Sequence, residues 1–227
     1  MVSLAARPAQ RAALAEVLPL LRPDHGPVLD VGAGSGAVLA DVLDALPTAH
    51  VLALEPSPSM RALALARVAQ RPDWFARVTV RPEDVLSAPL PPRIGGALAL
   101  GVLGHLDPGE RAALLAELAG RLPVGGVALL DLQPPATPER VEAYEFTAAT
   151  VGDLTYRGIA EAWPLDGERL RWRMTYLTLE GERVLVEEST EHEYHHPAPD
   201  VVAAEARAVG LTMTPATTST FWVLTRT

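Results

Sequence analysis

The chain has 227 residues, and its 19 arginines against 28 acidic residues give a net charge of −9 at pH 7. This charge opposes binding to a nucleic-acid phosphate backbone, and the length suits one α/β domain. The sequence contains no lysine and no cysteine, which excludes Schiff-base chemistry, thiolate nucleophiles and disulfides.

The first 26 residues are expected to form a helical region. Arg11 and Glu16 interrupt its apolar residues at helical spacing, so it does not resemble a secretory signal. The longest uncharged apolar stretch, residues 94–106, is shorter than the ~20 residues that span a bilayer. We expect a cytoplasmic protein with no membrane or nucleic-acid partner; a homodimer is compatible with these features.

Residues 27–134 alternate short apolar runs with longer amphipathic segments, the pattern of a parallel sheet flanked by helices. The predicted strands lie at 28–31, 51–54, 77–80, 96–101 and 126–132. The predicted helices lie at 36–46, 59–70 and 108–122. Asp107 is the expected N-cap of the last helix and Pro108 its first residue.

Polar and apolar residues alternate over 152–195, and the segments "PLDGE" and "EGE" are plausible hairpin turns. This pattern predicts an antiparallel three-stranded meander, inserted at 150–196. Residues 197–227 are predicted to form a helix, from about 200 to 210, and a closing hairpin. The whole of 1–227 is then a single domain.

The stretch "VLDVGAGSGAVL", residues 28–39, places Gly32, Gly34 and Gly36 between a strand and a helix. Such a turn lets a ligand approach the backbone and offers unpaired N–H groups, as nucleotide sites do. Gly32, Gly34 and Ala37 also satisfy the permissive dinucleotide pattern G-x-G-x-x-G/A, so the loop alone admits NAD.

Three acidic residues favour a different ligand. Asp30, just before the loop, would crowd a pyrophosphate but suits a cationic amine. Glu55 can accept hydrogen bonds from both ribose hydroxyls, and Asp84 from an adenine amino group with Val85 packed near the ring. Together they predict an adenosyl ligand with a charged amino-acid tail.

The segments "VLDVGAGSG", "VLALEPS", "EDVL", "ALALGVL" and "LPVGGVALL" occur in the order seen in class I S-adenosylmethionine-dependent methyltransferases. Over about residues 28–134 the chain resembles this family. The resemblance implies a Rossmann-like, doubly wound α/β fold with a seven-stranded sheet and one antiparallel strand, which "TFWVLTR" would supply.

The resemblance also implies S-adenosyl-L-methionine as cofactor and a set of residues that bind it. By motif position these are Asp30, Gly32, Gly34, Gly36, Glu55, Pro56, Asp84, Val85, Gly101 and Val102. The chain departs from many members at Gly95 and Gly96, where they carry an acidic residue. It also lacks the Asn/Asp-Pro-Pro-aromatic motif of members that methylate nucleic-acid amino groups.

The resemblance implies in-line methyl transfer to an O, N or C atom of a small-molecule acceptor, as in bacterial secondary metabolism. One alternative keeps S-adenosylmethionine as a structural or electrostatic element for a non-methyl reaction such as cyclisation. A non-catalytic adenosyl-binding or partner-binding domain and an NAD(P) oxidoreductase are further alternatives.

The segment "TEHEYHH" supplies candidates for a general base. In an extended strand His192, Tyr194 and His196 share one face, while His195 shares the other with two glutamates. Because histidine titrates near neutrality, His192, His195 and His196 are catalytic candidates. No metal site is predicted.

Tyr144 is a fourth catalytic candidate, as part of an aromatic wall of the acceptor pocket. His105 lies near the end of the fourth strand and is as readily structural as functional. For the "TEHEYHH" segment, the alternative to catalysis is a set of solvated residues that pair with Arg171 and Arg173 across the hairpin.

Overall fold

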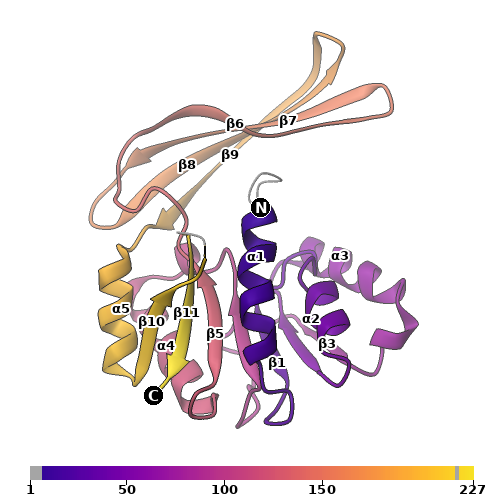
Figure 1. Cartoon of the computed structure of the whole chain (residues 1–227). Coiled ribbons are helices and arrows are strands. Elements are labelled where there is room, and N and C mark those ends of the chain that lie inside the picture. Colours follow the sequence, from indigo (N-terminus) through magenta and orange to yellow (C-terminus); the bar gives the residue numbers. More distant parts are fainter. Residues whose placement is uncertain (1–6, 218–219) are drawn as a thin grey trace.

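The chain forms two β-sheets (Figure 1). One lies between two layers of helices, and the other lies above this core. The structure, a computed structural model, describes residues 7–217 and 220–227. Residues 1–6 of the predicted N-terminal helical region, and residues 218 and 219 of the predicted closing hairpin, lie outside the described residues.

The larger sheet has seven strands, and β11 is the one that runs against the others. In spatial order the strands are β10 (Leu211–Pro215), β11 (Phe221–Arg226), β5 (Val127–Asp131), β4 (Gly96–Ala99), β1 (Val28–Val31), β2 (Val51–Leu54) and β3 (Val78–Arg81). The strands from β5 to β3 are mutually parallel. The fold implied by the resemblance is therefore confirmed, including the antiparallel strand "FWVLTR".

Every residue of β1, β2 and β4 is buried, because helices cover both faces of the sheet. The helices are α1 (Arg7–Val17), α2 (Leu39–Ala45), α3 (Pro58–Ala69), α4 (Pro108–Arg121) and α5 (Pro199–Ala208). Helices α1 and α2 contribute to the apolar core on one face, while α4 and α5 pack on the other. Among the described helices, none is long and apolar enough to cross a membrane.

The helix ends follow from local sequence. Asp107 caps α4 by accepting from the Glu110 backbone N–H at 2.8 Å, and the Glu110 side chain accepts from the Asp107 N–H at 3.0 Å. Helix α2 begins at Leu39 instead of the predicted position 36. The reason is that Gly36 has a φ of +70°, which a right-handed helix cannot contain.

The smaller sheet, which we call the cap sheet, is antiparallel and has four strands instead of the predicted three. They are β6 (Val141–Val151), β7 (Leu154–Pro164), β8 (Arg169–Glu180) and β9 (Arg183–His195). The additional strand is β6, which lies at the sheet edge and is mostly exposed. Its sequence, "VEAYEFTAATV", therefore lacks the polar and apolar alternation that marks a strand with one buried face.

The described residues also form three short 3₁₀ helices: η2 (Leu18–Leu20), η3 (Pro72–Trp74) and η4 (Leu103–His105). Of these, η4 follows β4 and contacts β9 of the cap sheet. Figure 1 shows the cap sheet arching above the core, with its distal hairpins projecting away. The junction of η4 and β9 therefore joins the cap sheet to one edge of the larger sheet.

Candidate active site

The carboxyl ends of β1 and β4 meet at a topological switch point. Strand β1 pairs with β2 on one side and with β4 on the other. The strand order therefore runs outward from β1 in two opposite directions, to β2 and β3 on one side and to β4 and β5 on the other. Ligands of open α/β sheets bind in the crevice at such a point. We call this edge of the sheet the cofactor edge.

The glycine loop after β1 borders this crevice, and its three glycines have different reasons to be glycine. A Cβ on Gly32 would lie 2.8 Å from Val102 Cγ2, and one on Gly36 would lie 2.9 Å from Leu39 Cδ1. A Cβ on Gly34 would have only the Gly32 carbonyl oxygen, at 3.9 Å, within reach. Gly32 and Gly36 thus allow close packing, whereas Gly34 leaves its backbone open to a ligand.

Glu55, the residue after β2, lies against the same loop and is buried. One carboxylate oxygen accepts the Gly34 N–H at 2.7 Å and the other accepts the Ser57 N–H at 2.8 Å. Pro56 follows it, and its carbonyl oxygen accepts a hydrogen bond from Arg61 Nη1 at 2.8 Å. The Glu55 carboxylate thus lies beside Gly34, with lone pairs left for ligand hydroxyls.

Asp30, in β1, is 4% exposed, and its Oδ2 atom has no hydrogen-bond partner. Burial, together with the smaller effect of the nearby Glu55 charge, raises the pKa of Asp30 to about 7. A buried carboxylate oxygen without a partner is costly, and an ammonium group would satisfy it. The expected adenosyl ligand with a charged amino-acid tail fits this position.

The raised pKa of Asp30 predicts that the folded protein loses stability as the pH rises, and that the substitution Asp30→Asn removes this loss. The pKa of Asp30 is about 7 in the folded protein and near 3.8 in the unfolded chain. Its stabilising contribution to the free energy of unfolding is therefore fully present below pH 3.8 and is lost as the pH rises to about 7. Above pH 7 we expect Asp30→Asn to raise the unfolding free energy by a few kcal/mol, at most about 4. Urea unfolding at pH 5 and pH 8 measures this.

The matched control for that measurement is Asp153→Asn, in the exposed turn between β6 and β7. It should leave the unfolding free energy unchanged at both pH values. The same Asp30→Asn variant should bind S-adenosylhomocysteine more weakly than the wild type, because a neutral amide pairs less well with an ammonium group. Equal stability gains at pH 5 and pH 8 would contradict the assigned titration.

Asp84 lies in the exposed loop after β3, where its carboxylate organises its own turn. It accepts the Leu86 N–H at 2.8 Å and the Ser87 hydroxyl at 2.7 Å. The hydrogen bond from the Ser87 side chain lowers the pKa of Asp84. Val85 is buried beside it. The turn thereby holds one carboxylate and one apolar side chain at the third strand of the cofactor edge.

Gly101 and Val102 follow β4 on the same edge. The Gly101 N–H donates to Asp131 Oδ1 at 2.6 Å, and Val102 packs against the glycine loop. Burial raises the pKa of Asp131 to about 6, partly offset by the Gly101 hydrogen bond. Asp131 is not among the site residues predicted from the sequence, although a carboxylate at the end of a buried strand is a signal that could have found it.

Above this edge, η4 and β9 bring three aromatic rings together. The ring centroids of His105 and Tyr194 are 4.5 Å apart, and those of Tyr194 and His192 are 4.6 Å apart. Burial lowers the pKa of both His105 and His192. Both imidazoles are therefore neutral at pH 7 and can accept a proton. We call these three residues the aromatic cluster.

The aromatic cluster depends on a glycine beneath it. A Cβ on Gly104 would lie 2.8 Å from Tyr194 Cδ1 and 3.3 Å from the His195 carbonyl oxygen. We expect Gly104→Ala to displace Tyr194 and to lower kcat about tenfold or more while cofactor affinity is unchanged. Steady-state kinetics and calorimetry with S-adenosylhomocysteine measure the two effects.

The control for Gly104→Ala is Gly120→Ala, in α4, where an added Cβ meets nothing within 4 Å. This variant should keep full activity. If Gly104→Ala were as active as Gly120→Ala, the position of Tyr194 would not matter for the reaction.

The other predicted catalytic residues lie elsewhere. His195 Nδ1 is 3.2 Å from Glu168 Oε1. His196 is buried and accepts from Trp172 Nε1 at 3.0 Å, while its Nδ1 lies 3.2 Å from the carbonyl oxygens of Gln133 and Pro135. Tyr144, on β6, is 47% exposed. Of the four predicted catalytic residues, His192 is the one that belongs to the aromatic cluster.

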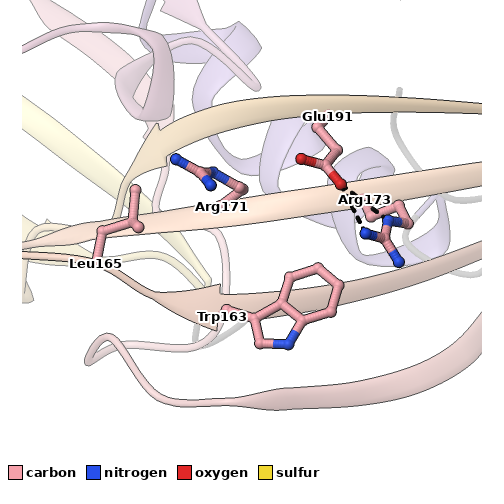
Figure 2. A pocket seen from close by; sticks show the side chains of 5 residues that line it. All are labelled: Trp163, Leu165, Arg171, Arg173 and Glu191. Atoms are coloured by element: carbon pink, nitrogen blue, oxygen red, sulfur yellow. Dashed lines mark hydrogen bonds and ion pairs between the residues drawn. The ribbon is translucent and has the colours of Figure 1, made fainter.

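The opposite face of the cap sheet carries a shallow pocket, shown in Figure 2. Arg173 lies 2.8 Å from Glu191 and over the Trp163 ring at 4.9 Å, and Arg171 lies 3.1 Å from Glu193. The predicted pairing of the "TEHEYHH" segment with these arginines is therefore confirmed for Glu191 and Glu193. Since strand residues alternate between faces, this pocket is separated from His192 by the sheet itself.

Residues 29–128 match the family model of a methyltransferase domain. No curated protein matches the chain in sequence. A solved structure similar to it is CalS10 from Micromonospora echinaspora, described as an amino pentose methyltransferase of calicheamicin biosynthesis with bound S-adenosylmethionine. The identity is 22% and the TM-score 0.76, covering 96% of this chain and 91% of that chain.

Two further solved structures share the fold. KedS8, a sugar N-methyltransferase from a Streptoalloteichus species, is 22% identical with a TM-score of 0.73, over 98% of this chain and 87% of its own. DesVI from Streptomyces venezuelae is 19% identical with a TM-score of 0.76, over 98% and 94%. The likeness thus includes the cap sheet as well as the core.

Proposed function

We propose that this chain is a class I S-adenosylmethionine-dependent methyltransferase and that it methylates an O, N or C atom of a small molecule, since residues 29–128 match a methyltransferase domain and the fold resembles that of CalS10. The observation that carries the proposal is the arrangement at the cofactor edge. An unpartnered buried carboxylate, Asp30, and an open glycine, Gly34, lie at one sheet edge, where neutral His105 follows the neighbouring strand.

The residues predicted to hold S-adenosylmethionine all lie at this edge. Asp30 would bind the ammonium group and Glu55, with Pro56 beside it, the ribose hydroxyls. The glycine loop and the backbone of Gly101 and Val102 would border the methionine portion, and Asp84 and Val85 the adenine. When bound, the cofactor supplies an electrophilic methyl group on a positively charged sulfur.

The protein's own contribution is to orient the acceptor, exclude water and remove a proton. An ammonium acceptor must lose a proton before its nitrogen can attack the methyl carbon, and a hydroxyl acceptor must lose its proton as the new bond forms. A neutral imidazole nitrogen of His105 takes that proton, and His192 is the second base in the cluster. Tyr194 packs between the two rings and sets their spacing.

Of the four predicted catalytic residues, His196 and His195 are not bases in this proposal, and Tyr144 is assigned to the acceptor pocket. Both ring nitrogens of His196 have hydrogen-bond partners, so neither is free to take a proton. His195 faces Glu168 at the base of the cap sheet. Tyr144 shares the core-facing side of the sheet, through its register with Ala160 and Met174, and is proposed to contact the acceptor.

We take the amino group of a sugar as the first acceptor to test. CalS10 is described as an amino pentose methyltransferase and KedS8 as a sugar N-methyltransferase, and both structures resemble this chain over the cap sheet as well. Bacterial secondary metabolism is the setting that these neighbours suggest.

The test incubates the protein with S-adenosylmethionine and matched sugars that carry either an amino or a hydroxyl group at one position. We expect S-adenosylhomocysteine and a product with one added methyl group from the amino sugar. Release of no S-adenosylhomocysteine with any acceptor, together with no binding of it by calorimetry, would overturn the proposal. A converted acceptor without an added methyl group would instead favour a non-methyl reaction.

A further inference from the structure

We propose that Arg111 is a positioning residue for the reaction, acting through Glu168 to fix the base of the cap sheet on helix α4. This contact sets the place of Tyr194 and His192 relative to His105. The inference rests on the proposed function only for its activity measurement, because the position of the cap sheet is measurable without turnover.

Arg111 is a buried charge that joins three segments of the chain. Its side chain is 1% exposed. Its Nη1 donates to Glu168 Oε1 at 2.7 Å, and its Nε donates to Glu205 Oε2 at 2.7 Å. Glu168 lies in the turn between β7 and β8, and Glu205 lies in α5. A single carboxylate is enough to neutralise the Arg111 guanidinium. The second carboxylate therefore serves to connect another segment of the chain to α4.

Glu168 in turn contacts the C-terminal end of β9. Its carbonyl oxygen accepts the His196 N–H at 2.6 Å, and its carboxylate lies 3.2 Å from His195 Nδ1. In the next ladder positions Arg169 pairs with His195 and Leu170 with Tyr194. Glu168, which makes the charged contact, is thus two residues from Leu170, the ladder partner of the Tyr194 whose ring packs against His105.

Among the ion pairs of the described residues, Arg111 with Glu168 is the one that links the cap sheet to the core. The remaining cap-sheet pairs join residues within that sheet or its turns. Figure 1 shows that the far end of the cap sheet projects beyond the core. The orientation of the sheet therefore depends on contacts at its base.

The two glutamates provide a matched pair of variants, Glu168→Ala and Glu205→Ala. Both side chains are 22% exposed and both lie 2.7 Å from Arg111. Each variant leaves Arg111 with one carboxylate, so each is expected to fold. Only Glu168→Ala cuts the link to the cap sheet, whereas Glu205→Ala cuts the link between α4 and α5.

We expect Glu168→Ala to lower kcat about 10- to 100-fold while the dissociation constant of S-adenosylhomocysteine stays within about twofold of the wild type. Glu205→Ala should keep kcat within about twofold, with a similar fall in melting temperature. Native-state amide exchange of residues 192–196 should accelerate in Glu168→Ala and not in Glu205→Ala.

Equal kcat losses in the two variants, or unchanged exchange at 192–196 in Glu168→Ala, would overturn the positioning role. A purely structural role would lower both melting temperatures without separating the two kcat values. Absence of methyl transfer by the wild type would refute the proposed function alone, because the exchange comparison decides the positioning role by itself.

Discussion

Replacing Gly34 by aspartate should abolish binding of S-adenosylhomocysteine. Gly34 has a φ of +56°, a conformation that costs other residues about 1–2 kcal/mol. The new carboxylate would occupy the open space above the loop, next to Glu55, whose oxygen lies 2.7 Å from the Gly34 nitrogen. Steric exclusion and repulsion together should raise the dissociation constant at least about 100-fold, equivalent to about 2.7 kcal/mol. Isothermal titration calorimetry measures the loss.

The control variant for Gly34→Asp is Gly181→Asp. Gly181 has a φ of +58° and open space around its Cβ position, but it lies in the turn between β8 and β9. It therefore carries the same backbone strain and the same added charge, far from the cofactor edge. This variant should bind S-adenosylhomocysteine like the wild type. Similar affinity in both variants would mean that the glycine loop is not the binding site.

The second large effect is expected at His105. We predict that His105→Gln lowers kcat by roughly 10²- to 10⁴-fold, the usual contribution of a general base. Glutamine retains hydrogen-bonding capacity and approximate size but cannot take the proton. Cofactor affinity should be unchanged, since the variant affects the acceptor side of the edge. Rapid-quench or steady-state methyl-transfer assays measure the change.

The pH dependence separates a base from a packing residue. Burial holds the pKa of His105 below its ordinary value of 6.5, so the wild-type rate should be level above pH 6.5 and fall at more acidic pH as the imidazole is protonated. His105→Gln should lose that acidic limb, whereas His50→Gln, at an exposed position, should retain it. An unchanged rate and profile in His105→Gln would transfer the role of base to His192.

The core of the fold was predictable from sequence because its signals are local. Strands β1 and β2 are uninterrupted apolar runs apart from Asp30. The start of helix α4 is indicated by its N-cap residue Asp107 and by Pro108 at the first helical position. The three glycines predict the turn after β1 equally well, because the preference of glycine for a positive φ depends on the single residue and not on distant contacts. These features place the predicted cofactor residues at one sheet edge.

The acceptor side was less predictable because it depends on contacts between distant segments. His105 and Tyr194 are 89 positions apart, and the contact between their rings follows from how β9 meets η4. Strand β6 lacks a buried face, so its pattern carries no period. His196 shares a strand face with His192 in the extended pattern, yet it lies past the end of β9 at His195 and bonds to the loop after β5.

A crystal structure of the complex with S-adenosylhomocysteine tests the central claim most directly. We predict the ribose hydroxyls on Glu55, the amino group on Asp30 and the sulfur facing the aromatic cluster of His105, Tyr194 and His192. Density for the ligand away from the glycine loop, or a sulfur directed away from His105, would contradict the account.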